Sequence, residues 1–276
     1  MPATDTTFII GSIREQEKDL LSPDNYQRLA DAENLAAAKQ ALTDTVYASY
    51  PDDPSLHLKA IRDMLADLVE SPSFIEFISA RYDGLNIASA LLEKKLGLLE
   101  PSELSPLGTI PFDLLHSVIW HNLGLEALPA HWQNFITNQL NQPTSDGWQT
   151  NIIIQTGQHT IEWLKKLAKT RLMKSIASLN ATRLNTDNQL RFSNTPLATI
   201  TSQLESHGYH LPLEHLQSVR QLEDATAYEK FWDTELIKLI NTVRYEPTGY
   251  DPILGFWYAK EIEVKSLRLL LATKDI

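Results

Sequence analysis

Cysteine is absent from the 276 residues of this sequence, which excludes disulfide bonds, thiol catalysis and thiolate metal sites. Glycine is scarce, at ten residues, and no phosphate-cradling glycine motif occurs, so we expect no nucleotide site. The sequence also lacks the Gly-x-Ser-x-Gly elbow of serine hydrolases and the His-Glu-x-x-His motif of zinc proteases. We therefore predict no catalytic residues, no cofactor and no bound metal.

Long hydrophobic runs are also missing. Nothing approaches the roughly 18 apolar residues of a membrane-spanning helix, and the run at residues 8–10 is too short to predict a signal peptide. Alternation of apolar and polar residues is nearly absent, with residues 151–155 as the ambiguous case. Helical spacing dominates elsewhere, so we predict an all-α fold.

Three histidines, His207, His210 and His215, cluster around a glycine and a proline. Imidazole is a common metal ligand, but Glu205 and Glu214 are the only carboxylates at a natural ligand spacing, and such a site needs a prepared pocket. We interpret the cluster as surface histidines on a turn.

The net charge of −11 argues against binding nucleic acid or an anionic lipid surface through bulk electrostatics. Residues 1–97 carry 9 basic and 16 acidic side chains, residues 98–186 carry 6 of each, and residues 187–276 carry 9 and 13. The basic residues of the middle third follow one another with no acid between positions 163 and 182. They are Lys165, Lys166, Lys169, Arg171, Lys174 and Arg183. Such a run is typical of a solvated helix face, and any partner that it binds should be acidic.

Helical periodicity and capping signals divide the chain into successive helices. We predict them over residues 6–21, 26–30, 32–42, 55–69, 74–96, 112–123, 129–140, 148–184, 196–206, 212–222, 225–243 and 252–274. Residues 97–111 are rich in proline and glycine and read as a linker, and the polar residues 185–194 read as a loop.

Three segments of the chain have the same types of residue at several positions when they are aligned with one another without gaps. They are residues 86–94, 175–183 and 266–274. Each has a small polar residue first, an aliphatic residue second and a basic residue last. A spacing near a third of the chain suits a small helical domain copied three times, although unrelated amphipathic helices also align to some extent. The predicted domains are residues 1–97, 98–186 and 187–276.

The last predicted helix is apolar most of the way round, which indicates a central, buried element. Asp251 and Pro252 mark its start, and Glu261, Lys265 and Arg268 form the narrow stripe left for water.

Lys260 and Glu263 project into the apolar sector of this helix, three residues apart and of opposite sign. One interpretation is a mutually neutralised pair whose aliphatic stems pack on the core. The other is that one of them reaches a charged group of a partner protein.

Residues 259–268 read Ala-Lys-Glu-Ile-Glu-Val-Lys-Ser-Leu-Arg. This segment resembles the signature Ala-Lys-Glu-x-Glu-aliphatic-x-Asn-aliphatic-Arg of the V-type and A-type ATPase component that is named C in prokaryotes and d in eukaryotes, with Ser266 in place of asparagine. Residues 39–47 are similar to the family's Leu-x-x-Thr-x-Tyr stretch, and Asp83, Asn86 and Ile87 resemble its Asp-x-x-Asn-aliphatic motif. The sequence departs from the family at Leu172, where an acid is expected, and in its short length.

The resemblance implies a non-catalytic central-stalk subunit with three helical-bundle domains arranged as a funnel. Such a subunit sits on the cytoplasmic face of the membrane, on the proteolipid rotor ring, and receives the shaft subunits of the D and F type. It transmits torque between the shaft of the sector that handles ATP and the membrane ring that transports protons or sodium ions. By this analogy we expect structural or partner contacts from the charged residues of two segments. They are Lys260, Glu261, Glu263, Lys265, Arg268, Lys165, Lys166 and Lys169.

Two other classes of function stay open. One is a soluble adaptor or regulatory protein derived from the same fold, which Leu172 and the short length keep open. The other is a helical enzyme that uses Glu261 and Glu263, but residues two apart on a helix point about 200° away from each other, which suits a carboxylate dyad poorly.

Overall fold

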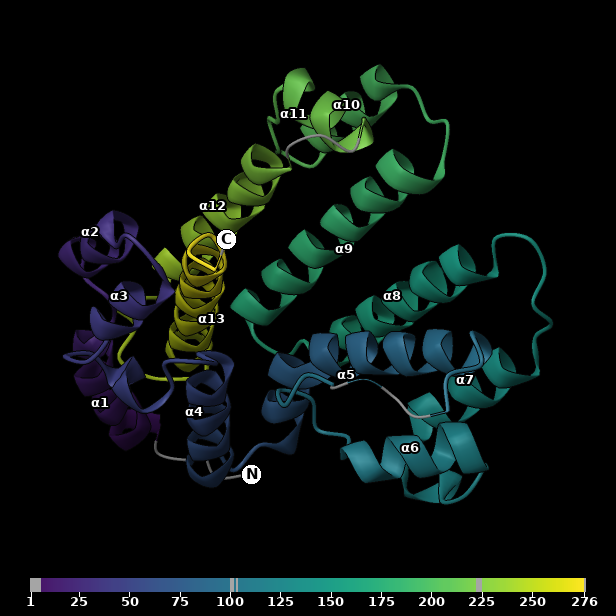
Figure 1. Ribbon diagram of the computed structural model, residues 1–276, viewed down its shortest axis with the longest axis horizontal. Coiled ribbons are helices and arrows are strands. Elements are labelled where there is room, and N and C mark those ends of the chain that lie inside the picture. The colour runs from purple at the N-terminus through teal and green to yellow at the C-terminus, as the bar shows by residue number, and fades with distance from the viewer. Residues whose placement is uncertain (1–5, 100–101, 103, 222–224, 276) are drawn as a thin grey trace. The chain divides into compact units, whose positions relative to one another are not determined.

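The computed structural model describes residues 6–99, 102, 104–221 and 225–275, and all regular secondary structure in these ranges is helical (Figure 1). The predicted all-α fold is therefore confirmed. The α-helices are α1 (Thr6–Gln16), α2 (Pro23–Asp31), α3 (Leu35–Gln40), α4 (Ser55–Leu68), α5 (Pro72–Lys95), α6 (Phe112–His121), α7 (Ala130–Asn141), α8 (Trp148–Leu167), α9 (Arg171–Phe192), α10 (Leu197–Ser206), α11 (Leu213–Arg220), α12 (Thr226–Asn241) and α13 (Asp251–Ala272). The 3-10 helices are η1 (Glu17–Asp19), η2 (Val46–Ser49) and η3 (Leu125–Ala127). Within the described ranges, no helix has both the length and the apolar character needed to span a bilayer.

Several predicted helices are confirmed with small differences at their ends. Those predicted over residues 55–69, 112–123 and 252–274 are α4, α6 and α13. Apolar spacing explains this success, since α4 buries Leu58 and Leu65, which are two turns apart on one face.

The single helix predicted over residues 148–184 is wrong at one point, because α8 ends at Leu167 and α9 begins at Arg171. After α8 the backbone of Ala168 is extended, with ψ of 98°. Thr170 Oγ1 then accepts a hydrogen bond from the Met173 backbone N–H at 3.2 Å, which is the contact of an N-cap residue. No proline or glycine marks this break, so the periodic pattern continues across it.

The loop predicted over residues 185–194 is also wrong, because α9 continues to Phe192. Two of its residues, Thr186 and Leu190, are each 3% exposed. The hydroxyl of Tyr228 on α12 donates a hydrogen bond to Asp187 Oδ1 at 2.5 Å. Packing against neighbouring helices, which local composition does not report, therefore keeps this polar segment helical.

Two predicted elements extend beyond the described residues. The predicted linker, residues 97–111, includes residues 100, 101 and 103, and the helix predicted to end at residue 222 includes that residue. These four positions lie outside the described part of the chain.

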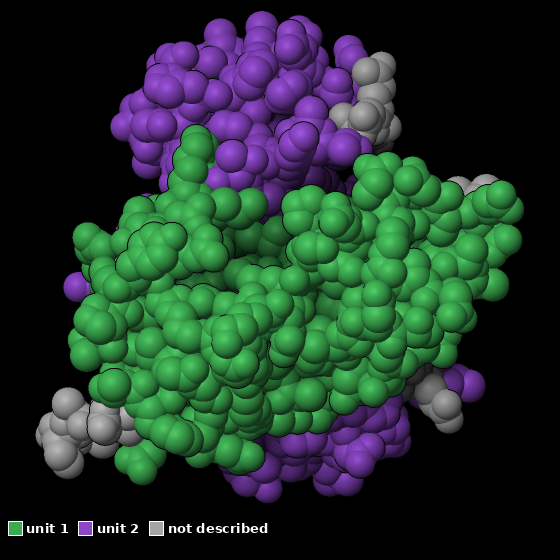
Figure 2. All heavy atoms as spheres, turned by 90° about the vertical axis from the view of Figure 1, so that its left-hand side faces the viewer, with its two compact units in different colours: residues 1–78, 170–173, 235–276 green, residues 79–169, 174–234 purple. Residues whose placement is uncertain are grey.

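The chain forms two compact units, coloured separately in Figure 2. Unit 1 comprises residues 1–78, 170–173 and 235–276, and unit 2 comprises residues 79–169 and 174–234. The first two repeated segments fall in the long helices α5 and α9, and the third covers the end of α13 and the two residues after it. The division into three domains stays a prediction.

Unit 1 is built around α13, which contacts α1, α2, α3 and α4 (Figure 1). Phe256, Trp257 and Leu267 on α13 are at most 1% exposed. A helix buried on several sides is the central element that its sequence predicts.

Unit 2 has a core formed by α5, α6, α7 and α8, whose members include Leu91, Ile119, Trp132 and Ile152. A Cβ atom at Gly84 on α5 would overlap the Oγ1 atom of Thr160 on α8. The glycine therefore allows these two helices to approach closely.

The segment before α6 is fastened to α5 by the side chains of Asp83 and Asn86. Asp83 Oδ1 accepts hydrogen bonds from the backbone N–H groups of Thr109 at 2.7 Å and Ile110 at 3.0 Å. The Asn86 amide donates to the Ser105 carbonyl at 3.0 Å and accepts from its N–H at 2.9 Å. The Asp-x-x-Asn motif therefore satisfies backbone groups that a loop lacking a partner strand would leave unpaired.

Candidate functional site

Lys260 and Glu263 form a buried ion pair on α13, with Lys260 Nζ 2.8 Å from Glu263 Oε1. The two residues are 1% and 4% exposed. Their spacing of three residues places both side chains on the same face of the helix. Removing an ion pair from water costs free energy, and further polar contacts offset that cost. The surroundings of this pair therefore decide how much its burial costs.

Those further contacts come from the N-terminal part of unit 1. The hydroxyl of Tyr47 donates to Glu263 Oε1 at 2.7 Å, and the backbone N–H of Leu21 donates to Glu263 Oε2 at 2.6 Å. Lys260 Nζ lies 3.5 Å from the carbonyl oxygen of Asp19 and 5.6 Å from the centre of the Tyr47 ring. The pair therefore joins α13 to segments more than 200 residues earlier in the chain.

Neutral aromatic side chains surround this ion pair. Burial, and then the charge of Glu263, raises the pKa of Tyr26 to about 12. The same two causes raise the pKa of Tyr47, so both hydroxyls keep their protons at neutral pH. Burial, and then the charge of Lys260, lowers the pKa of His57, whose ring centre lies 4.9 Å from that of Tyr47.

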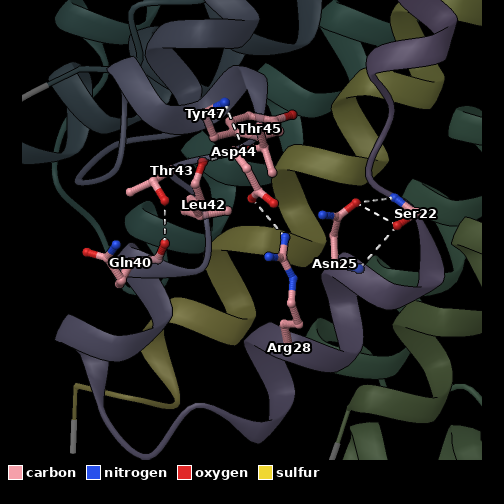
Figure 3. Close-up of polar contacts among 9 residues, drawn as sticks. All are labelled: Ser22, Asn25, Arg28, Gln40, Leu42, Thr43, Asp44, Thr45 and Tyr47. Atoms are coloured by element: carbon pink, nitrogen blue, oxygen red, sulfur yellow. Dashed lines mark hydrogen bonds and ion pairs between the residues drawn. The ribbon is translucent and has the colours of Figure 1, made fainter.

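Local hydrogen bonds hold Tyr47 in place for this contact (Figure 3). Thr45 Oγ1 donates to the carbonyl oxygen of Leu42 at 2.8 Å and accepts from the backbone N–H of Tyr47 at 3.1 Å. Arg28 of α2 pairs with Asp44 at 2.8 Å, beside the same segment. The residues of the Leu-x-x-Thr-x-Tyr pattern therefore act together, and they meet the C-terminal signature at Glu263.

The other candidate residues of α13 differ in exposure. Arg268 is exposed and Lys265 is half-buried. Glu261 was expected to face water together with them, but it is only 8% exposed, so that expectation is wrong. Neighbouring segments therefore cover more of α13 than its sequence indicates.

Lys165, Lys166 and Lys169 are exposed and belong to unit 2, whereas the candidates of α13 belong to unit 1. Lys165 pairs with Glu162, one turn earlier on α8, at 3.1 Å. The structure therefore gathers these lysines at the end of α8 and in the short connection after it.

A pair of histidines that the sequence analysis did not single out lies between α7 and α8. The ring of His131 stacks on Trp163 with 3.8 Å between centres, and the ring of His159 stacks at 5.7 Å from that of His131. Neither Nε2 atom has a hydrogen-bond partner among the described residues, although both are buried. Burial, and then the charge of His159, lowers the pKa of His131 to about 4, and burial followed by Lys166 lowers that of His159.

The described residues contain no cluster of three or more histidine, aspartate or glutamate side chains that could hold a metal ion. His207 uses its Nδ1 atom to donate to the carbonyl oxygen of Gln203 at 2.7 Å.

Fold and site together define a class of protein: the described residues form an all-α fold in which a buried ion pair on the last helix is bonded to segments near the start of the chain. Residues 158–275 match the family model described as ATP synthase (C/AC39) subunit, and this range includes α9 and α13. The match confirms, over these residues, the resemblance to the C/d family of V/A-type ATPase subunits that the sequence predicts. No curated protein matches the chain.

Proposed function

We propose that this protein is a non-catalytic central-stalk subunit of a V/A-type ATPase. Its partners are the shaft subunits of the D and F type and the proteolipid rotor ring, and it is peripheral on the cytoplasmic face of the membrane through that ring. It couples the rotating shaft to the ring for the transport of protons or sodium ions, or for ATP synthesis. The three predicted domains would form the socket.

The observation that carries this proposal is the family match over residues 158–275, because it includes the signature helix α13. The packing of α13 is suited to the role. A part that transmits torque needs elements that do not slide, and α13 is fixed to the start of unit 1 by Glu263, which bonds both Tyr47 and Leu21. Hydrogen bonds to an ionised group are stronger than neutral ones, so this connection resists displacement.

Purification from the protein's own membranes tests the proposal. The tagged full-length chain is recovered from gently solubilised membranes at low salt, and the co-purifying chains are quantified by mass spectrometry. A proteolipid ring subunit and the ATP-handling subunits in fixed proportion support the assignment. Recovery of the protein entirely in the soluble fraction, without these chains, overturns it.

Coupling is tested separately in membranes from which the protein has been removed. A socket that transmits torque predicts the loss of ATP-driven ion transport, while the soluble sector still hydrolyses ATP. Restoring the full-length chain restores transport. If transport is the same with and without the protein, the coupling role is wrong.

Leu172 favours a second candidate function, that of a soluble adaptor or regulatory protein with the same fold. This leucine stands where the resemblance leads us to expect an acid, and it is 2% exposed. A buried leucine cannot supply a charged contact to a rotor partner. The adaptor predicts stable binding of a soluble protein and no association with the proteolipid ring.

A further inference from the structure

An open groove of about 450 Å³ lies within unit 2. It is formed by the end of α8, one face of α9 and the end of α10, whose order along the chain can be followed in Figure 1. Lys165, Lys174 and His207 supply its basic groups. No aspartate or glutamate is present among the residues that line it in the described part of the chain.

The face of α9 in this groove is made of small side chains at helical spacing. Ala177 and Ala181 are one turn apart and continue the row that begins at Lys174. Together with Asn185 they extend over about 16 Å of helix, at roughly 1.5 Å per residue. Small side chains let a second helix pack closely, so the length and floor of the groove suit a helix.

The charge of the groove contrasts with that of the protein. The chain has a net charge of −11, yet Lys165 and Lys174 line the groove and the exposed Lys166 and Lys169 lie beside it in the sequence. The pair of Lys165 with Glu162 is an exposed i, i+3 contact at 3.1 Å, and such pairs are weak enough to be exchanged. The net negative charge of the whole protein disfavours a nucleic acid. A short acidic segment is held within the groove, where the nearest charges are basic.

We propose that this groove binds an acidic amphipathic helix of a partner protein. Its carboxylates pair with Lys165 and Lys174, and its small apolar face packs on Ala181, above the buried Ala177. This inference names the chemistry of a partner and does not require that partner to be a rotor subunit, so it goes beyond the proposed function.

The absence of cysteine from the chain allows a direct test. Ser178, an exposed residue that lines the groove, is replaced by cysteine and labelled with a photo-crosslinker in the full-length protein. After irradiation in an extract of its own cell, the attached peptide is identified by mass spectrometry. We expect a segment rich in aspartate and glutamate at helical spacing. Crosslinks confined to lipid, to nucleic acid or to peptides without acidic residues overturn the proposal.

Charge reversal shows whether the two lysines carry the contact. In the Lys165→Glu, Lys174→Glu variant, the yield of the acidic crosslink should fall by about tenfold, because two attractions become repulsions. Lys230→Glu, Lys238→Glu is the matched control. Both of these lysines are exposed, and Lys238 pairs with Glu235 three residues earlier, as Lys165 does with Glu162. Equal yields from the two variants would refute the role of the groove.

A synthetic copy of the captured segment completes the test in solution. Fluorescence anisotropy should show that it binds the unmodified protein, and that a copy with lysine at each acidic position binds only the Lys165→Glu, Lys174→Glu variant. If that variant does not fold, Lys165→Gln, Lys174→Gln replaces it, and this neutral variant should bind the acidic copy more weakly than the unmodified protein does. Capture of the acidic segment without any ring subunit in the membrane purification would overturn the rotor assignment and leave the groove proposal standing.

Discussion

Replacing Lys260 with methionine removes the charge of the buried ion pair and keeps most of the aliphatic stem. The Glu263 carboxylate then stays 4% exposed, with the Tyr47 hydroxyl and the Leu21 N–H as its remaining donors. Breaking a buried pair in this way costs about 3–5 kcal/mol, and we expect the lower end because two donors remain. The free energy of unfolding should therefore fall by about 3 kcal/mol.

The reverse change, Glu263→Gln, leaves the Lys260 ammonium with the Asp19 carbonyl oxygen at 3.5 Å and the face of the Tyr47 ring. It should cost about 3–5 kcal/mol, since no carboxylate then neutralises the charge. The double variant should be more stable than the sum of the single losses predicts, by about 2 kcal/mol, because neither charge is left alone.

Urea unfolding followed by far-ultraviolet circular dichroism measures these losses. Because the chain has two compact units, unit 1 also needs a signal of its own. Trp257 supplies it, as the only tryptophan in the sequence of unit 1. Its ¹⁹F resonance in protein labelled with 5-fluorotryptophan is assigned by comparison with Trp257→Phe.

Arg268→Met is the matched control, because it removes a positive charge from an exposed position of the same helix. It should change the free energy of unfolding by less than about 0.5 kcal/mol. If Lys260→Met costs no more than Arg268→Met, the argument that the buried pair fastens α13 is wrong.

Three further predictions concern unit 2. His131 and His159 are neutral in the folded state because their pKa values are lowered. In the unfolded chain the same histidines take up protons near pH 6.5, so the folded state loses stability as the pH falls from about 6.5 towards 4. Urea midpoints at pH 7 and pH 5 should reveal a loss of about 1–2 kcal/mol that His131→Phe reduces, and an unchanged pH dependence in that variant would contradict the assignment. Gly84→Ala should lower the free energy of unfolding by about 1–3 kcal/mol in urea titrations, because its methyl group overlaps a hydroxyl of α8, and wild-type stability would exclude the close approach. Asp83→Ala should lower the free energy of unfolding by about 2–3 kcal/mol, because it leaves two backbone N–H groups without their acceptor. The segment before α6 should then be cleaved in limited proteolysis, and an unchanged cleavage pattern would show that other contacts hold it.

Features encoded by neighbouring residues could be predicted from the sequence. The spacing of Leu58 and Leu65 predicts α4, and the apolar character of α13 predicts its central position in unit 1. The interruption between α8 and α9 could be found only through the capping side chain of Thr170, since neither glycine nor proline marks it.

The candidate site was predictable in its parts but not in its assembly. The spacing of Lys260 and Glu263 allows an ion pair, and the structure contains it. The contact of Glu263 with Tyr47 joins positions 216 residues apart, and no local pattern reports such a contact. The burial of Glu261 was missed for the same reason, because it depends on neighbours contributed by distant segments.

The hydrogen bond between Leu21 and Glu263, which are 242 residues apart, also has a consequence for folding during synthesis on the ribosome. At roughly 5–20 residues per second, Glu263 is added about 12–50 seconds after Leu21. Helices α1 to α4 are therefore synthesised long before the helix that buries their apolar faces, and every residue of unit 2 is joined to the chain before Glu263 is added. The helices made first are thus the last to be covered, and in the growing chain they are the natural clients of chaperones.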